Sequence, residues 1–144
     1  MKSPIHRIRI ACGFALPILL LSACATNSAT KAPETNLSKL KSFYVVREPQ
    51  DDHGVELLIA SRLNKMGYQS DSGEAPKPAA PVDAIVTYQD HWQWDMSMYM
   101  IKLEIQIHDG TSDAVLAKGE VYRPSLQRKS PDGMVEEALG AIFK

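Results

Sequence analysis

The chain has 144 residues, 44% of them hydrophobic, and a formal net charge of −1. This length is sufficient for one domain with a buried core. The lack of a basic excess argues against a nucleic-acid-binding protein, because such proteins need positive charge to bind phosphates.

The first 23 residues have the three parts of an export signal. An apolar run over residues 10–21 follows a basic region and precedes small residues; the basic residues are Lys2, Arg7 and Arg9. The run is shorter than the roughly 20 residues that a membrane-spanning helix needs, and it contains Pro17. We therefore expect residues 1–23 to be a signal peptide that is cleaved, not a permanent anchor.

The end of this segment, Leu21-Ser22-Ala23-Cys24, resembles the bacterial lipobox, in which a branched apolar residue and two small residues precede a cysteine. The resemblance implies that the Cys24 thiol receives a diacylglycerol, that cleavage occurs before Cys24 and that the new amino terminus is acylated. Two or more acyl chains anchor a protein stably, whereas one does so only marginally. The alternative is an ordinary secretory cleavage nearby, with Cys24 as a small residue that carries no lipid.

The residues around the cysteine define the expected mature protein. The residue after the cysteine is Ala25 and not Asp, and in this respect the chain resembles the enterobacterial lipoproteins that are sent to the outer membrane. Cys12 lies in the segment expected to be removed, so no intramolecular disulfide is expected. Removal of the leader would leave 13 basic and 17 acidic residues. We expect a mildly acidic protein that is anchored to the envelope and faces the periplasm.

Residues 24–42 contain mostly Ala, Thr, Asn, Ser, Lys and Pro, a composition with too few large apolar side chains to form a core. We expect this segment to be a lipidated flexible tether, with Leu37 and Leu40 marking where the fold begins. Residues 43–144 then form a single domain.

The first elements of that domain are a strand and a helix. Residues 42–47 favour a strand that ends at Glu48-Pro49. Residues 53–66 form one apolar stripe at helical spacing, comprising Val55, Leu58, Ile59, Leu63 and Met66. Asp51 or Asp52 is the expected N-cap, and Gly67 the expected left-handed residue after the helix.

Strands dominate the next part of the chain. A short strand begins near Tyr68 and Gln69, and residues 70–81 are expected to be a surface loop. Residues 83–94, 99–108 and 114–122 favour strands. Alternation predicts the inward side chains of the last two, which are Tyr99, Ile101, Leu103, Ile105, Ile107, Val115, Ala117, Gly119 and Val121.

The chain closes with a second predicted helix. Ser130 is a good N-cap, Pro131 suits the first helical position, and Val135, Leu139, Ile142 and Phe143 form the apolar stripe. The order β-α-(β)-β-β-β-α predicts an α+β two-layer sandwich, with two helices on one face of a mostly antiparallel sheet. This order behind a lipobox resembles small bacterial envelope lipoproteins of the DUF4136 type, whose activity is unknown, so the resemblance implies no site residue.

The segment 88–100 is the most unusual in composition, because it contains both tryptophans and three methionines. On a strand, Tyr88, Asp90, Trp92 and Trp94 share a face. Tyr88, Trp92 and Trp94 could stack on a sugar ring, accept a partner's apolar side chain or touch lipid headgroups. The alternative is structural: the rings cover the sheet face that the helices leave bare, and the methionines fill gaps.

A short basic segment, residues 123–130, lies in an otherwise acidic domain. Arg128 and Lys129 could extend the binding surface toward an acidic partner or lipid headgroups. The alternative is a solvated charged loop.

Polar side chains elsewhere give little indication of catalysis. Asp51, Asp52 and His53 are clustered, but their spacing does not resemble a zinc motif such as His-Glu-x-x-His, and a capping role accounts for the acids. A Gly-x-Ser-x-Gly motif and a glycine-rich phosphate loop are absent from the sequence. We expect no metal, no cofactor and no enzymatic activity.

The sequence therefore favours a non-enzymatic, membrane-anchored periplasmic lipoprotein that acts as a binding or assembly module. Its expected partners are the lipid bilayer, through acylated Cys24, and an envelope protein or glycan of unknown identity. The alternative is a module that binds an envelope glycan or small ligand on the aromatic strand face.

Overall fold

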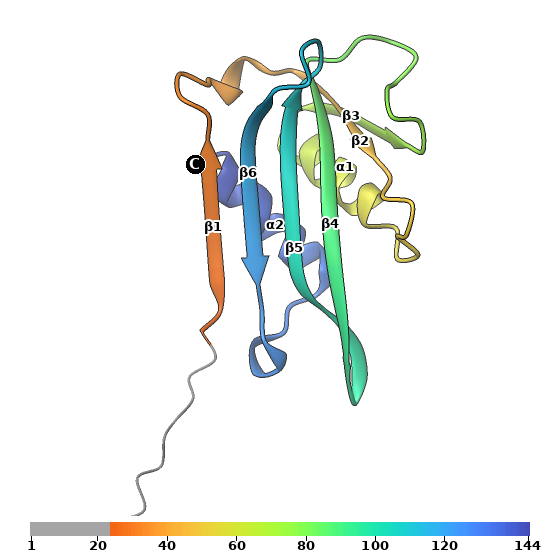
Figure 1. The fold of residues 1–144 in the computed structure, drawn as a ribbon, viewed down its shortest axis with the longest axis vertical. Coiled ribbons are helices and arrows are strands. Elements are labelled where there is room, and N and C mark those ends of the chain that lie inside the picture. Colours follow the sequence, from red (N-terminus) through yellow and green to blue (C-terminus); the bar gives the residue numbers. More distant parts are fainter. Residues whose placement is uncertain (1–23) are drawn as a thin grey trace, which may run out of the picture.

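A computed structural model describes residues 24–144 (Figure 1). The predicted signal peptide, residues 1–23, lies outside the described residues. A six-stranded sheet carries two helices on one face, so the predicted α+β class is confirmed. The elements are β1 (Thr26–Lys31), β2 (Ser42–Val46), α1 (Val55–Lys65), β3 (Gln69–Gly73), β4 (Ala84–Asp95), β5 (Ser97–Asp109), β6 (Val115–Tyr122) and α2 (Pro131–Ile142), with short 3-10 turns η1 (Leu37–Lys39) and η2 (Ser125–Gln127).

The strand order across the sheet is β1-β6-β5-β4-β2-β3. The pairs β1–β6, β6–β5 and β5–β4 are antiparallel, whereas β2 is parallel to both of its neighbours, β3 and β4. The β2–β3 pair is parallel because α1 connects these strands as a crossover, and the segment 74–83 returns the chain so that β4 is parallel to β2 on its other side. None of the helices in residues 24–144 is long and apolar enough to cross a membrane.

Local chemistry accounts for most helix ends, although the N-cap residue of α1 is Gly54, in the left-handed conformation, and not Asp51 or Asp52 as predicted. Asp51 accepts hydrogen bonds from the backbone N–H groups of His53, Gly54 and Val55, which supplies the acceptor that the start of α1 needs. Gly67, just after α1, has φ of 94°, a value that glycine adopts at little cost. Ser130 Oγ accepts the Gly133 N–H at the start of α2, and Pro131 is its first residue.

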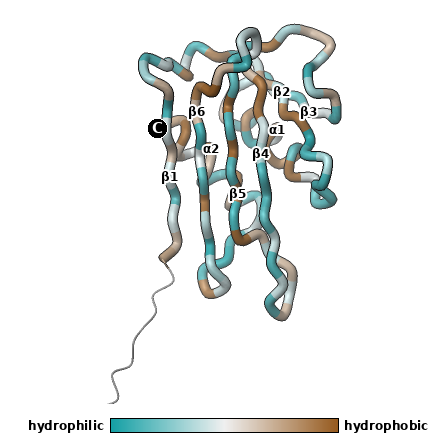
Figure 2. Tube along the Cα trace, viewed as in Figure 1, coloured by the Kyte–Doolittle hydropathy of each residue, from teal (hydrophilic) through white to brown (hydrophobic). Residues whose placement is uncertain are grey.

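The core lies between the two helices and one face of the sheet. Figure 2 shows the apolar segments along the strands and on the helices behind them. The fully buried large side chains of the core come from both layers and include Phe43, Ile59, Leu63, Leu103, Ile105, Ile107, Leu139 and Ile142. Burying such side chains contributes about 1.5–3 kcal/mol each relative to exposure, so this interface dominates the stability.

The prediction of a flexible tether over residues 24–42 is wrong, because Thr26–Lys31 form the edge strand β1. All six side chains of β1 are exposed. The strand is positioned by its backbone, which pairs with β6 from Thr26 opposite Tyr122 to Lys31 opposite Ala117. Main-chain hydrogen bonds do not require apolar side chains, so the composition of this segment could not reveal the strand. Leu37 in η1 is also buried, and the fold therefore begins at β1.

A bulge changes which side chains of β5 face the core. His91 lies opposite Lys102 and Trp92 opposite Met100, which leaves Ile101 as an extra residue in β5. Met100 is fully buried and Ile101 is half-buried, so the predicted inward position of Ile101 is wrong. The inward positions of Leu103, Ile105 and Ile107 are confirmed.

Two smaller differences also come from strand pairing. A register shift between Ile107 and His108 accompanies an exposed Val115, which was expected on the inward face with Ala117. Strand β3 continues to Gly73 because it pairs with β2, so the first part of segment 70–81 is not a loop.

Two glycines test the packing of α2 against the sheet. A methyl group at Gly119 would lie 2.8 Å from Ile142 Cδ1 and 3.0 Å from the Ala138 carbonyl oxygen, whereas one at Gly140 would meet nothing within 4 Å. We expect Gly119→Ala to destabilise the fold by about 1–3 kcal/mol through overpacking. Gly140→Ala, a control on the exposed face of α2, should stabilise the helix by about 0.5–1 kcal/mol. Urea unfolding of both variants measures the difference, and equal stabilities would contradict this packing.

Candidate functional site

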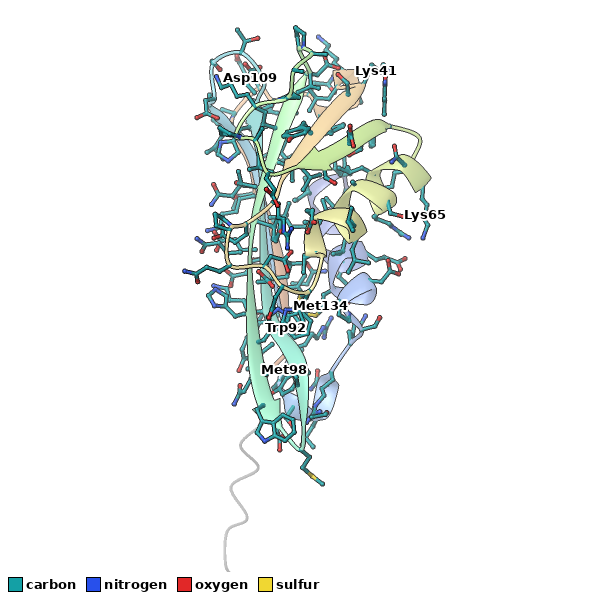
Figure 3. All side chains as sticks on the ribbon, turned by 90° about the vertical axis from the view of Figure 1, so that its right-hand side faces the viewer. Lys41, Lys65, Trp92, Met98, Asp109 and Met134 are labelled. Carbon is teal, nitrogen blue, oxygen red and sulfur yellow. The ribbon has the colours of Figure 1, made fainter. Side chains whose placement is uncertain are left out.

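The β4–β5 hairpin extends past the helix layer at one end of the molecule (Figure 3). Three large apolar side chains at its end are exposed: Trp94 by 68%, Met96 by 92% and Met98 by 55%. Leu126, in the neighbouring turn η2, is 98% exposed. We call these four residues the apolar tip. Polar and apolar atoms of a folded surface are normally intermixed, so a cluster of this kind indicates a contact surface.

The hairpin reverses direction at Met96. Asp95 and Ser97 are paired across the turn, and Met96 between them has φ of 59°. A side chain in this left-handed conformation costs about 1–2 kcal/mol, and glycine or asparagine is the usual occupant. A long apolar side chain is therefore displayed at the most exposed point of the hairpin at a cost in stability.

Arg128 fastens turn η2 to the hairpin. Its Nη1 donates to Ser97 Oγ (2.8 Å), and its Nη2 donates to the Asp95 carbonyl oxygen (2.8 Å) and carboxylate (3.1 Å). The guanidinium carbon lies 4.2 Å from the centre of the Tyr99 ring. Ser125 Oγ also donates to the Asp95 carboxylate. The hydrogen bond from Ser125 and the charge of Arg128 hold the pKa of Asp95 below its usual value.

Lys129 has a different role from its neighbour. Its Nζ lies 2.7 Å from Glu137 Oε1, and the Arg123 Nε donates to the other oxygen of the same carboxylate at 2.9 Å. Burial would raise the pKa of Glu137, but hydrogen bonds from these two cations outweigh it and lower the pKa. Lys129 thus ties the loop before α2 to that helix, while Arg128 reaches the hairpin.

Trp92 lies on the same strand face as Trp94 but is half-buried. Its ring is stacked on the His53 ring, with centroids 3.7 Å apart and planes 12° apart, and its Nε1 donates to Asp90 Oδ2 at 2.6 Å. His53 Nδ1 in turn lies 2.6 Å from Asp52 Oδ1. One face of the indole is therefore occupied by the segment that leads into α1.

Tyr88 is buried, with 3% of its surface exposed. Its hydroxyl donates to Asp51 Oδ2 (2.6 Å) and accepts the Glu48 N–H (3.2 Å). Burial, followed by the bond to Asp51, raises the pKa of Tyr88. The predicted surface of Tyr88, Trp92 and Trp94 therefore does not exist as one exposed ledge. The alternative that these rings cover the bare sheet face is also wrong, because Tyr88 and Trp92 pack on the side that carries α1.

Asp51 organises the polar side chains around Tyr88. Burial alone would raise its pKa, but hydrogen bonds from Tyr88 and from the N–H groups of His53 and Val55 outweigh it and lower the pKa. Burial and the nearby Asp51 raise the pKa of Glu56. Ligand atoms of Asp51, Asp52 and His53 lie within 4.8 Å of one another. Asp51 bonds to the start of α1, whereas Asp52 contacts His53 and His53 stacks on Trp92.

Sequence reasoning missed a groove at the opposite end of the sheet. It has a volume of about 800 Å³ and lies between strands β2 and β3 and the loop that follows β3, lined by Tyr44, Ser70, Asp71, Lys77, Pro78 and Pro81 among others. The buried Ser70 Oγ has no hydrogen-bond partner among the described residues. No periodic signal in the sequence marks a groove formed by a loop folding over a sheet.

Fold and site together define a small open-sheet α+β domain with an apolar end. No protein-family model matches the chain, and no curated protein matches it in sequence. The structure is similar to PelC from Paraburkholderia phytofirmans, solved as a dodecamer in two crystal forms, one of them of a variant. The TM-scores are 0.64 and 0.60, each at 14% identity over 83% of this chain and 99% of that chain.

A second similar structure is a PDZ domain protein from Parabacteroides distasonis. Its TM-score is 0.52 at 12% identity, and the match covers 82% of this chain but 34% of that chain. At these identities the likeness concerns the fold alone.

The Asp51 cluster can be tested by stability. We expect Tyr88→Phe to lower the free energy of unfolding by about 1–3 kcal/mol, because a hydrogen bond to a charged, buried carboxylate is lost. Asp51→Asn should also lower the free energy of unfolding, and this free energy should then fall less steeply as the pH is lowered. The lowered pKa of Asp51 means that its contribution is present above the unfolded-state pKa and is lost as pH falls through the folded-state pKa. Chemical unfolding from pH 7 to pH 3 measures both effects; an unchanged acid slope in Asp51→Asn would contradict this assignment.

Proposed function

We propose that this protein is a lipoprotein anchored to the bacterial envelope through Cys24, and that its domain is a non-enzymatic binding or assembly module on the periplasmic side, facing away from an outer-membrane bilayer. The observation that carries the proposal is the lipobox, Leu21 to Cys24, placed directly before the first strand of the fold. Cys24 is exposed, which leaves its thiol accessible to acylation.

The distance between the anchor and the fold is short. Only Ala25 separates Cys24 from β1, and one extended residue spans about 3.3–3.6 Å. An acylated Cys24 would therefore hold the domain against the membrane surface instead of releasing it on a long tether. A binding module in this position acts on partners at the membrane surface.

Self-association is the form of assembly that the comparisons favour. PelC, whose fold is similar, was solved as a dodecamer. In this chain the Ala32 N–H donates to the Leu116 carbonyl oxygen, so alternate residues of β1 face β6. The backbone groups of Asn27, Ala29 and Lys31 point to the open edge. An unpaired strand edge is a ready template for a strand of a second copy.

The glycan-binding alternative has less support. A sugar platform needs an accessible aromatic face, and among the three candidate rings Tyr88 is buried and Trp92 is stacked on His53. Trp94 alone is widely exposed, and the nearby Asp95 and Ser97 side chains are already hydrogen-bonded to Arg128.

The anchor is tested by Cys24→Ser. We expect this variant to lose incorporation of labelled fatty acid and to accumulate as unprocessed precursor, because the thiol that receives the lipid is absent. Cys12→Ser is the matched control and should be labelled and processed normally. Radiolabelled palmitate, followed by gel analysis and intact-mass measurement, gives the readout. Normal processing of Cys24→Ser would refute the anchor.

The open edge is tested by proline substitutions in β1. Ala29→Pro removes an outward-facing N–H, which an edge strand tolerates, and should abolish self-association without lowering the melting temperature. Thr30→Pro removes an N–H that faces β6 and should lower the melting temperature. Native mass spectrometry of the detergent-solubilised protein measures the oligomer. A monomeric wild type, or an oligomer that survives Ala29→Pro, would contradict this mode of assembly.

A further inference from the structure

The apolar tip and the start of the fold lie at the same end of the molecule. Figure 1 shows β1 beginning at the end where the β4–β5 hairpin turns. The register agrees: Thr26 lies opposite Tyr122, Tyr122 lies opposite Lys102, and Lys102 lies opposite His91. Cys24 precedes Thr26 by two residues, so an anchor there would place this end of the sheet nearest the membrane.

The hairpin reaches farther in this direction than the anchor residue does. Asp95 is four residues beyond His91, which corresponds to about 13 Å of strand. Cys24 extends at most about 7 Å past Thr26. Any bilayer that holds acyl chains on Cys24 therefore lies within reach of Trp94, Met96 and Met98.

The chemistry of this end suits a bilayer surface. Six large apolar side chains are exposed in residues 24–144, and four of them form the apolar tip: Trp94, Met96, Met98 and Leu126. Tryptophan is enriched at membrane interfaces, where its ring lies at the level of the headgroups. Asp95, the only charged residue between Trp94 and Tyr99, is paired with Arg128, so the end of the hairpin carries little net charge.

The backbone at the tip suits the hydrated headgroup region. The residues on either side of Met96 are paired across the hairpin, from Asp95 with Ser97 to Trp92 with Met100, but the outer edges of this part of the hairpin have no strand partner and need water. The left-handed Met96 would be less strained as glycine, yet the chain places a methionine there.

We infer that the apolar tip inserts into the headgroup region of the bilayer that holds Cys24, and that it fixes the domain upright on the membrane as a second attachment point. This inference rests on the proposed lipid anchor. The acyl chains hold the protein on the bilayer, and an inserted apolar tip buries further apolar area at a second point, which limits the orientation of the domain.

The two tryptophans allow a direct test. Trp92→Phe leaves Trp94 as the only tryptophan, and Trp94→Phe leaves Trp92. Each lipidated variant is reconstituted into phosphatidylethanolamine–phosphatidylglycerol vesicles with brominated acyl chains, which quench indole fluorescence at short range. We expect the emission of Trp94 to fall to roughly half or less and to shift to the blue, as for an interfacial tryptophan. Trp92, held against His53, should be quenched much less. Circular dichroism confirms that both variants are folded.

The outcomes separate the tip from the anchor. The mass of each sample reports acylation of Cys24 independently of the fluorescence. Acylated protein with unquenched Trp94 overturns the inference and leaves the anchor in place, whereas unmodified Cys24 overturns the proposed function. Equal quenching of both tryptophans also overturns the inference, because it means that the domain has no defined orientation. A blue shift of the Trp94 emission in native membranes, without quenching in these vesicles, would show that Trp94 contacts a protein and would also overturn the inference.

Met96→Gly adds a variant whose folded state is not expected to suffer. Glycine suits the φ of 59°, so the melting temperature should stay the same or rise. Quenching of Trp94 in the Trp92→Phe background should nevertheless weaken, because one inserted side chain is lost. Unchanged quenching would show that Met96 does not contribute to the attachment.

Discussion

The apolar face of the central strands is packed against α1 and α2 along only part of its length. From Val86 and Ile107 down to Met100 most side chains on this face are buried, and Asp90 and Trp92 are half-buried. The hairpin then continues to Met96 beyond the two α-helices. The chain forms turn η2 beside the hairpin, where Arg128 bonds to Ser97, and α2 begins only after this turn. The exposed apolar tip is a direct result of this difference in length between the sheet and the helix layer.

Polar interactions at the boundary of the core determine which residues remain available. The Asp51 carboxylate is buried because it caps α1 and binds Tyr88, and this removes Tyr88 from the surface. The stack of His53 on Trp92 extends the covered region by one more ring. Arg128 joins η2 to the hairpin and adds Leu126 to the exposed group. The accessible site is therefore the part of the aromatic segment that these contacts leave uncovered.

The pairing of β1 with β6 connects this site to the proposed anchor. A flexible segment before the domain would let the domain adopt any orientation relative to a membrane. Because β1 pairs with β6 in a fixed register, the strand begins at one defined end of the domain, which is the end where the hairpin turns. The same strand leaves one sheet edge open, so the proposed anchoring, orientation and contact between copies all depend on six residues with exposed side chains.

The sequence by itself determined the α+β class, both helices, the N-cap of α2 and the inward side of most of β5, because hydrophobic periodicity and capping depend on residues close together in the chain. Only the tertiary structure decided the rest. Strand β1 depends on backbone bonds to β6, about ninety residues away, and Met100 replaces Ile101 in the core because of a bulge in strand pairing. Tyr88, Trp92 and Trp94 share one face in the sequence pattern, yet they differ in exposure because their neighbours come from the segment before α1. Contacts between distant segments carry no local signal, and these contacts decide which aromatic side chain is free to bind.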